Sequence, residues 1–362
     1  MAIKAIVTAG GTAGHINPAI AIAKQITAHG GKVLFIGKEG GMETDLVTKE
    51  GFPISCIKVA GFKRSLSPSN LKTVFLAAKG LSETRKIIKN FAPDIVIGCG
   101  GYVSGPAVFS AAMMKIPTLI HEQNVFPGMT TKILSRVVNR ICVSFEESIK
   151  YLPGKDKAVL TGNPVREGIL NVNPALARDE LNIAEPTLLV FGGSIGAKKI
   201  NDTMLDIVKT KEINFRIIWG TGKRYYDDII KSLEGVKIGD NITITPYIYN
   251  MDSVMAASDI VVGRAGAITL SEICAMGKCS VLIPSPYVTN NHQEHNATAL
   301  QDAGAAVMLR EQELSADILF DTVSSLFADS KKADTIRANA LKMAKPNASR
   351  NIYEQALKLT RH

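Results

Sequence analysis

The sequence predicts an α/β protein made of two doubly wound, mostly parallel sheets, one in each half of the chain. A glycine turn at residues 10–14 (Gly-Gly-Thr-Ala-Gly) recurs with the same spacing at residues 192–196 (Gly-Gly-Ser-Ile-Gly), each time directly after a short apolar run. Apolar runs typical of strands alternate with helix-like stretches in both halves, which is the pattern of a parallel sheet. The length of 362 residues fits two domains of ordinary size.

The first half is expected to alternate strands with helices. The expected strands are residues 3–8, 32–36, 54–59, 95–97 and 118–121, and the expected helices are residues 18–29, 70–91 and 106–115. Pro18 suits the first turn of a helix, because its missing N–H is not needed there. Parallel strands present their carboxyl ends at one edge, so the loops that follow them are the expected ligand site.

The same alternation restarts at Thr187. The expected strands are residues 187–191, 216–219, 242–245, 259–262 and 280–284, and the expected helices are residues 201–209, 268–276 and 295–303. Gly162-Asn163-Pro164 interrupts the pattern, which predicts a domain of residues 1–162 and another of residues 163–340. The stretch 331–359 has helical character. The C-terminal segment, residues 341–362, is expected to pack back on the first domain.

Composition and charge limit the possible function classes. No apolar run approaches the roughly 18 residues that span a bilayer, and the first residues lack the pattern of an export signal. The five Cys form no CxxC pair, which favours reduced thiols in a cytoplasmic protein over metal ligands. Residues 1–160 carry 20 Lys and Arg against 10 Asp and Glu, so the whole net charge of +9 lies in that half. This half is therefore expected to meet an anionic partner.

The loops of the first half carry candidate chemistry. A strand that leads through a glycine turn into a helix offers backbone N–H groups and a positive helix end to an anion, so Thr12 and Gly14 are expected to contact substrate. His15 follows at the helix entrance and could take a proton from a substrate hydroxyl, although a capping or packing role is the plain alternative. A further glycine turn spans residues 98–106. The cluster His121-Glu122-Gln123-Asn124 ends another strand and is either a site or a set of ordinary polar loop residues.

Two motifs of the second half could bind a nucleotide sugar. Residues 263–272 follow a strand, and there Thr269 could bind phosphate and Glu272 could accept two ribose hydroxyls. The spacing of Thr269 and Glu272 also matches a helix capping box, which would leave Arg264 unexplained. Polar side chains crowd residues 290–296, and this density suits the hydroxyls of a sugar better than a metal ion. No Asp-x-Asp occurs in the chain, which argues against a metal-bound nucleotide sugar. No cofactor is expected either.

Seven motifs in this order closely resemble the MurG family of bacterial N-acetylglucosaminyltransferases. The matching stretches, from Gly10 to Ala297, are GGTAGHINPA, GCGGYVSGP, HEQN, GNPVR, GGSIGAKKIN, GRAGAITLSE and NNHQEHNA. The resemblance implies two Rossmann-like domains facing a cleft, the GT-B arrangement. It also implies a metal-independent, inverting transfer of N-acetylglucosamine from UDP-N-acetylglucosamine to the C4 hydroxyl of undecaprenyl-pyrophosphoryl-N-acetylmuramyl-pentapeptide (lipid I). The product is lipid II, a precursor of peptidoglycan.

The same resemblance assigns roles to matching residues. It places the acceptor in the first domain, facing His15, Tyr102 and Glu122, with His15 as the expected base and Glu122 as the second candidate. It places the donor in the second domain. The implied donor contacts are Ser194 for the diphosphate, Arg264 as a residue that lines the donor site, Ala267, Ile268 and Thr269 for sugar and phosphate, Glu272 for the ribose, Tyr247-Ile248 for uracil, and Asn124, Arg166, Gln293 and Asn296 for N-acetylglucosamine. At His292 relatives can carry Gln, so its expected sugar contact departs from the family pattern.

A basic amphipathic helix is the expected membrane contact. Apolar residues at helical spacing lie among cations, namely Leu71, Val74, Phe75, Ala78 and Leu81 among Lys72, Lys79, Arg85 and Lys86. Such a helix is typical of a peripheral protein at an anionic surface, here the cytoplasmic face of the cell membrane. The alternative is an ordinary core stripe with a solvated basic face.

Other classes of protein fit less well. A dinucleotide-dependent enzyme would need a glycine where Thr12 stands. A nucleic-acid-binding protein would explain the basic half but not the polar cluster of the second half. The closer alternatives share the fold, and they are a glycolipid glycosyltransferase and a UDP-sugar epimerase.

Overall fold

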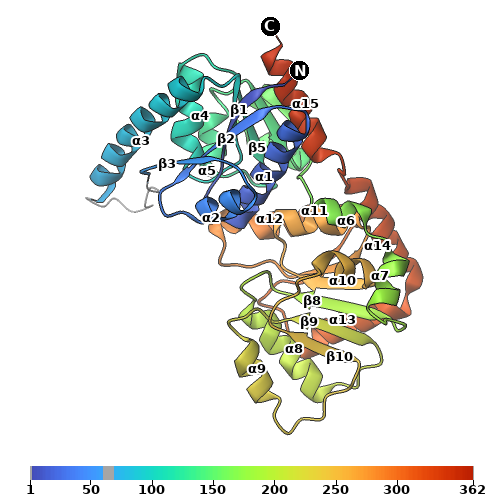
Figure 1. Ribbon diagram of the computed structural model, residues 1–362. Coiled ribbons are helices and arrows are strands. Elements are labelled where there is room, and N and C mark those ends of the chain that lie inside the picture. The colour runs from blue at the N-terminus through green and yellow to red at the C-terminus, as the bar shows by residue number, and fades with distance from the viewer. Residues whose placement is uncertain (1, 60–68, 362) are drawn as a thin grey trace. The chain divides into compact units, whose positions relative to one another are not determined.

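The computed structural model describes residues 2–59 and 69–361, with the helix backbone alone over 69–78. The chain divides into two compact units, Met1–Val165 with Lys345–His362, and Arg166–Ala344. Each unit is a parallel sheet with helices (Figure 1). The first boundary therefore follows Val165, and the second follows Ala344.

Within the described residues, the first unit holds a seven-stranded parallel sheet in the order β3-β2-β1-β4-β5-β6-β7. Its strands are β1 (Lys4–Thr8), β2 (Lys32–Lys38), β3 (Ile54–Ile57), β4 (Ile95–Gly98), β5 (Thr118–Glu122), β6 (Arg140–Val143) and β7 (Ala158–Leu160). The winding direction reverses between β1 and β4, where Thr8 lies opposite Gly98. The loops after these two strands therefore leave the sheet side by side, as in doubly wound folds.

Helices cover both faces of this sheet. They are α1 (Ala13–Ala28), α2 (Met42–Lys49), α3 (Ser69–Phe91), α4 (Ser104–Met113), α5 (Met129–Leu134) and α15 (Ala348–Thr360), with short turns η1 (Glu146–Tyr151) and η2 (Lys155–Lys157). Along β1, Ala5 and Val7 join one buried cluster while Ile6 joins another, because successive side chains of a strand point to opposite faces. Figure 1 shows α15, in red, beside α1, in blue.

Helix α1 begins earlier than expected. Of the three glycines in this turn, only Gly11 has a positive φ, at +88°. The helix therefore begins at Ala13, and His15 lies in its first turn. Pro18 is therefore inside the helix, and its expected place in the first turn is wrong. Without an N–H, Pro18 cannot donate to the carbonyl of Gly14 as other helical residues do.

Within the described residues, the second unit repeats this plan with a six-stranded parallel sheet in the order β10-β9-β8-β11-β12-β13. Its strands are β8 (Thr187–Phe191), β9 (Arg216–Gly220), β10 (Ile242–Thr245), β11 (Ile260–Gly263), β12 (Cys279–Leu282) and β13 (Val307–Met308). Its helices are α6 (Glu167–Asn171), α7 (Pro174–Glu180), α8 (Lys198–Thr210), α9 (Tyr226–Ser232), α10 (Met251–Ala257), α11 (Ala267–Ala275), α12 (His292–Asp302), α13 (Ala316–Ala328) and α14 (Ser330–Met343), with a short turn η3 (Thr289–Asn291). Here the winding direction reverses between β8 and β11, where Phe191 lies opposite Gly263.

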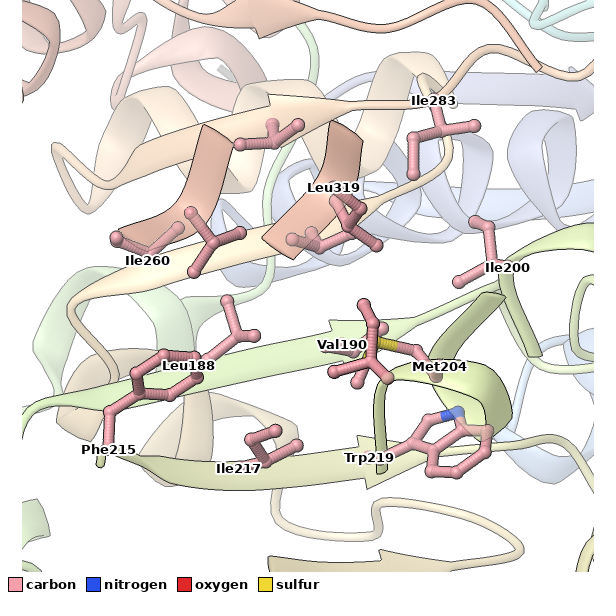
Figure 2. Packing of buried hydrophobic residues seen from close by; sticks show 14 of the residues in the cluster. Leu188, Val190, Ile200, Met204, Phe215, Ile217, Trp219, Ile260, Ile283 and Leu319 are labelled. Carbon is pink, nitrogen blue, oxygen red and sulfur yellow. The ribbon is translucent and has the colours of Figure 1, made fainter. Parts of the chain in front are cut away.

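The core of the second unit packs around Trp219, which is fully buried. Leu188 and Val190 of β8 and Ile217 of β9 meet Met204 of α8 in this cluster (Figure 2). The indole N–H of Trp219 donates to Asn201 Oδ1 at 3.0 Å, so the one polar atom of the ring is paired. This apolar layer holds the strands in register and fixes the loops at their carboxyl ends.

The helical stretch expected over residues 331–359 is two helices that belong to different units. Helix α14 ends at Met343 in the second unit, and α15 begins at Ala348 in the first. Pro346 lies between them and has no N–H to continue a helix. Among the described helices, none combines the length and the apolar composition needed to cross a bilayer.

Candidate functional site

Two glycine loops pack against each other at the carboxyl edge of the first sheet. A side chain at Gly101, which has φ +76°, would place its Cβ 2.2 Å from the carbonyl oxygen of Gly10. A Cβ on Gly100 would lie 2.7 Å from Nδ1 of His15. Glycines at these positions therefore let the loop after β4 approach both the loop after β1 and the imidazole of His15.

The imidazole of His15 belongs to a chain of polar side chains. Its Nδ1 lies 2.9 Å from Gln123 Oε1. The Gln123 amide nitrogen lies 2.9 Å from the carbonyl oxygen of Cys99 and 3.0 Å from Nδ1 of His121. On its other side, His121 Nε2 lies 3.0 Å from the carbonyl oxygen of Gly162. Burial lowers the pKa of His121 to about 4, so this ring is neutral at pH 7.

The carboxylate of Glu122 is used to hold the loop after β5. Its Oε1 accepts the backbone N–H of Asn124 at 3.1 Å and the Asn124 side-chain amide at 3.3 Å, and its Oε2 accepts the N–H of Gly128 at 3.1 Å. Glu122 is only 2% exposed. The structure thus brings both expected bases to the same edge, but it leaves only His15 partly open to solvent.

The remaining expected acceptor contacts line the same loops. Thr12 and Gly14 are exposed at the start of α1, and the Thr12 hydroxyl makes no capping hydrogen bond there. Tyr102 is 36% exposed in the loop before α4, and the ammonium of Lys38 lies 5.9 Å from the centre of its ring. The edge of the first sheet therefore combines the N-terminus of a helix, an imidazole and a phenol.

In the second unit, the loops after β8 and β11 leave the sheet as neighbours. Ser194 is exposed in the first of these loops. Arg264, in the second, is largely buried, because it forms an ion pair with Glu311 and its Nη1 donates to the carbonyl of Ile283 at 3.1 Å. Arg264 therefore lies at the expected edge as part of a buried ion pair.

Glu272 binds Arg166 and does not cap a helix. The helix α11 begins after Gly266, so Thr269 lies inside its first turn and the capping-box alternative is wrong. Arg166 Nε lies 2.9 Å from Glu272 Oε1, and its Nη1 lies 3.0 Å from Asp252 Oδ1. Burial raises the pKa of Glu272, and Arg166 opposes that rise. Burial also disfavours the charged guanidinium, but Glu272 and Asp252 outweigh it and raise the pKa of Arg166.

The polar residues of α12 tie this helix to the loops of the sheet edge. Gln293 Oε1 accepts the backbone N–H of Ser285 at 2.9 Å, and the Asn296 amide donates to the carbonyl of Ala265 at 3.2 Å. His292 Nδ1 lies 2.8 Å from the carbonyl oxygen of Thr289. All three positions thus lie beside the loops after β11 and β12.

The other expected donor residues lie at the same edge. Ala267, Ile268 and Thr269 form the first turn of α11. Ile248 is buried beyond β10, whereas its neighbours Tyr247 and Tyr249 are exposed and pack edge to face at 4.9 Å.

Three residues at these edges carry contacts that the sequence analysis missed. Glu43 of α2 is 1% exposed and accepts the N–H of Lys38 at 2.7 Å and of Gly11 at 3.4 Å. Gln123 connects His15 to His121. Glu311 pairs with Arg264. For Gln123 the polar cluster at the end of β5 is a signal, whereas Glu43 and Glu311 lie in stretches that resemble ordinary surface.

Two parallel doubly wound units, each with paired glycine loops at the point where its winding reverses, define a nucleotide-sugar enzyme of the GT-B class. Residues 5–143 match the model of the glycosyltransferase family 28 N-terminal domain, and residues 187–353 match that of its C-terminal domain.

Comparison with known proteins identifies the family. An Acetivibrio thermocellus protein is 50% identical over 358 residues, which cover 97% of each chain. A Clostridioides difficile protein is 44% identical, and the match covers 99% of this chain and 89% of that protein. Both are named UDP-N-acetylglucosamine--N-acetylmuramyl-(pentapeptide) pyrophosphoryl-undecaprenol N-acetylglucosamine transferase.

Solved structures agree with this comparison. The crystal structure of Acinetobacter baumannii MurG matches 98% of this chain and 99% of its own, with a TM-score of 0.81 at 27% identity. A Neisseria meningitidis UDP-GlcNAc 2-epimerase shares the fold with a TM-score of 0.69 at 16% identity, over 98% of this chain and all of its own. The chain belongs to the MurG family of glycosyltransferases, which confirms the resemblance drawn from its motifs.

Proposed function

We propose that the protein transfers N-acetylglucosamine from UDP-N-acetylglucosamine to the C4 hydroxyl of lipid I, which forms lipid II and releases UDP. The hydroxyl oxygen attacks the anomeric carbon, the bond to the diphosphate breaks, and the configuration inverts from α to β. Membership of the MurG family at up to 50% identity over nearly the full length is the observation that supports this reaction most strongly.

His15 is our proposed general base for the acceptor hydroxyl. It lies in the first turn of α1, partly exposed, between the two glycine loops of the first sheet edge. Glu122 is less suited to this role, because its oxygens already accept N–H groups of Asn124 and Gly128. A positioned base supplies about 10²–10⁴-fold in rate.

The donor site is proposed at the carboxyl edge of the second sheet. The exposed loop at Ser194 and the first turn of α11 offer backbone N–H groups to a diphosphate. Glu272 is proposed to bind the ribose, with Gln293 and Asn296 close to the sugar. A helix end lowers the activation free energy by at most about 2 kcal/mol, and a general base lowers it by roughly 3–5 kcal/mol. Enzymes lower it by at least about 8 kcal/mol in total. Substrate positioning must therefore supply the remainder.

The test is product analysis with UDP-N-acetylglucosamine and a polyprenyl-pyrophosphoryl acceptor. We expect a β-linked disaccharide on the lipid without added metal ions. His15→Ala should lower kcat by about 10²–10⁴-fold, whereas Glu122→Gln should retain most of it once its folding has been verified. Release of an epimerised sugar without acceptor would instead identify a UDP-sugar epimerase.

We also propose that the first unit binds an anionic membrane surface on the cytoplasmic side. Four large apolar side chains are exposed on two helices that contact each other: Phe109 (36%) and Met113 (52%) on α4, and Met129 (68%) and Ile133 (55%) on α5. Lys132 lies on the same α5, with its ammonium 3.7 Å from the Phe126 ring centre. Part of the expected basic stripe on α3 lies outside what the structure describes, because the side chains of Lys72, Val74 and Phe75 are not among the described ones.

Vesicle flotation tests this surface. The wild type should float with vesicles that contain anionic phospholipid, and Met129→Glu with Ile133→Glu should stay in the dense fraction. Reversing the charges of Lys72 and Lys79 tests the α3 stripe separately. If about four cations of the stripe contribute ~1 kcal/mol each, the whole stripe strengthens binding roughly a thousandfold, and loss of these two lysines removes about thirtyfold of it. Equal flotation of all three proteins would contradict the proposed surface.

A further inference from the structure

The orientation of the Gln123 side-chain amide is fixed by its surroundings. One end of the amide lies 2.9 Å from the carbonyl oxygen of Cys99 and 3.2 Å from that of His121. A carbonyl oxygen only accepts hydrogen bonds, so this end must be the amide nitrogen. Gln123 is 2% exposed, which makes an unpaired orientation costly. The amide oxygen therefore faces His15.

This orientation determines which nitrogen of His15 carries the proton. Gln123 Oε1 can only accept, and it lies 2.9 Å from His15 Nδ1, so Nδ1 carries the hydrogen. A neutral imidazole has one N–H, and Nε2 is then left with a free lone pair. A general base needs such a lone pair to take the proton of a hydroxyl.

His121 is held in the opposite tautomer by the same amide. The Gln123 amide nitrogen cannot accept a hydrogen bond and lies 3.0 Å from His121 Nδ1, so Nδ1 is the acceptor in this contact. The ring proton is then on Nε2 and donates to the carbonyl of Gly162 at 3.0 Å. Because burial lowers the pKa of His121 to about 4, the ring keeps a single proton at neutral pH and the assignment holds.

We propose that Gln123 is a positioning residue that sets the Nδ1–H tautomer of the neutral His15 ring and thereby leaves the lone pair of that ring on Nε2. The carbonyl oxygens of Cys99 and His121 fix the orientation of the Gln123 amide, and the amide oxygen of Gln123 sets the tautomer of His15. The catalytic consequence rests on the proposed function, in which His15 is the base. The tautomer itself is a property of the free protein and does not depend on the reaction.

The direct test is nitrogen NMR of the full chain labelled with 15N-histidine, in which only six His contribute signals. His15→Gln and His121→Gln assign the two rings. In the wild type we expect His15 as Nδ1–H and His121 as Nε2–H at pH 7.5. Gln123→Met should convert His15 to a mixture of tautomers, whereas Ser144→Ala should leave it unchanged, although Ser144 Oγ lies 3.3 Å from His121 Nε2. A His15 ring that is Nε2–H in the wild type, or unaltered by Gln123→Met, would overturn the inference.

Kinetics provide a second readout. Gln123→Met should lower kcat about threefold to tenfold, the fold-change that corresponds to one neutral hydrogen bond, with KM for the donor within about twofold. Gln123→Glu still accepts from Nδ1–H, but its charge favours the imidazolium, so the acid limb of the kcat profile should move to higher pH. An unmoved acid limb in folded Gln123→Glu would contradict the assignment. Full activity of His15→Ala would refute the proposed base and leave the tautomer result standing.

Discussion

At the scale of single residues, Glu272 depends on a partner far away in the sequence. Arg166 lies 106 positions earlier and reaches it at 2.9 Å, while also contacting Asp252 at 3.0 Å. Burial raises the pKa of the Glu272 carboxyl, and the ion pair with Arg166 opposes that rise. One carboxylate oxygen is thus used by Arg166, and Oε2 is the atom that we propose for the ribose.

Glu272→Gln should weaken UDP binding about tenfold to a hundredfold, because a hydrogen bond to a charged group contributes about 1.5–3 kcal/mol. Isothermal titration calorimetry with UDP measures this change. Asp252→Asn is the matched control, since it alters the other partner of Arg166 and should change the affinity less than threefold. Unchanged UDP binding by Glu272→Gln would remove Glu272 from the donor site.

His121 makes the first unit sensitive to acid. Its folded pKa of about 4 lies below the unfolded value of 6.5, so the unfolded chain binds more protons between these values. The contribution of His121 to the free energy of unfolding is therefore complete above pH 6.5 and falls by up to about 3 kcal/mol as the pH falls to 4.

Denaturation at pH 7 and pH 4.5 measures this effect as the difference between the wild type and His121→Gln. Far-UV circular dichroism follows both units, whereas the fluorescence of Trp219 follows only the second. We expect the wild type and His121→Gln to differ with pH in the transition followed by dichroism. The transition followed by Trp219 fluorescence should show no such difference. Parallel pH profiles of the two proteins would contradict the assignment.

At the scale of elements, a helix stabilises the first glycine loop through one side chain. Glu43 lies in the first turn of α2, and its oxygens accept N–H groups at the end of β2 and in the loop after β1. The Glu43 side chain is only 1% exposed, so the carboxylate reaches these N–H groups from inside the protein. The geometry of the loop before His15 therefore depends on α2.

Replacing Glu43 by Ala should lower the free energy of unfolding by about 1–3 kcal/mol for each N–H left unpaired. Asp45→Ala on the exposed side of the same helix is the control and should change it by less than about 0.5 kcal/mol. Chemical denaturation compares the two variants. Equal effects would mean that α2 does not hold the loop.

Most element positions could be predicted from local pattern. The expected strands 187–191 and 242–245 coincide with β8 and β10, because β8 is a buried and mostly apolar run and β10 alternates β-branched apolar and polar residues. The helices α2, α5 and α10 were not predicted, since elements of six to eight residues contain too few turns for a clear periodicity. Helix α1 begins five residues before its expected start, because the glycine turn ends sooner than its composition indicates.

At the scale of the whole molecule, the end of the chain completes the unit formed by its beginning. Helix α15 places Ile352, Tyr353 and Ala356, all less than 4% exposed, in the core cluster of α1 and β1. The second unit lies between these segments in the sequence. The first unit therefore cannot be complete until the last residues are available.

Ile352→Ala should lower the stability of the first unit by about 2–5 kcal/mol, because it leaves a cavity beneath α1. The Trp219 fluorescence transition, which reports the second unit, should move little. Glu354→Ala on the exposed side of α15 is the control. A shift of the Trp219 transition as large as that of the dichroism signal would show that the two units unfold together.

The sequence by itself determined the family, the two parallel sheets and the loops of the candidate site. Strand and helix periodicity and glycine turns are local signals, and parallel connectivity brings the carboxyl ends of strands to one edge. Only the tertiary structure decided which side chains meet there. His15 and Gln123 are 108 residues apart, and packing of whole elements, which no local pattern encodes, places their atoms within hydrogen-bonding distance.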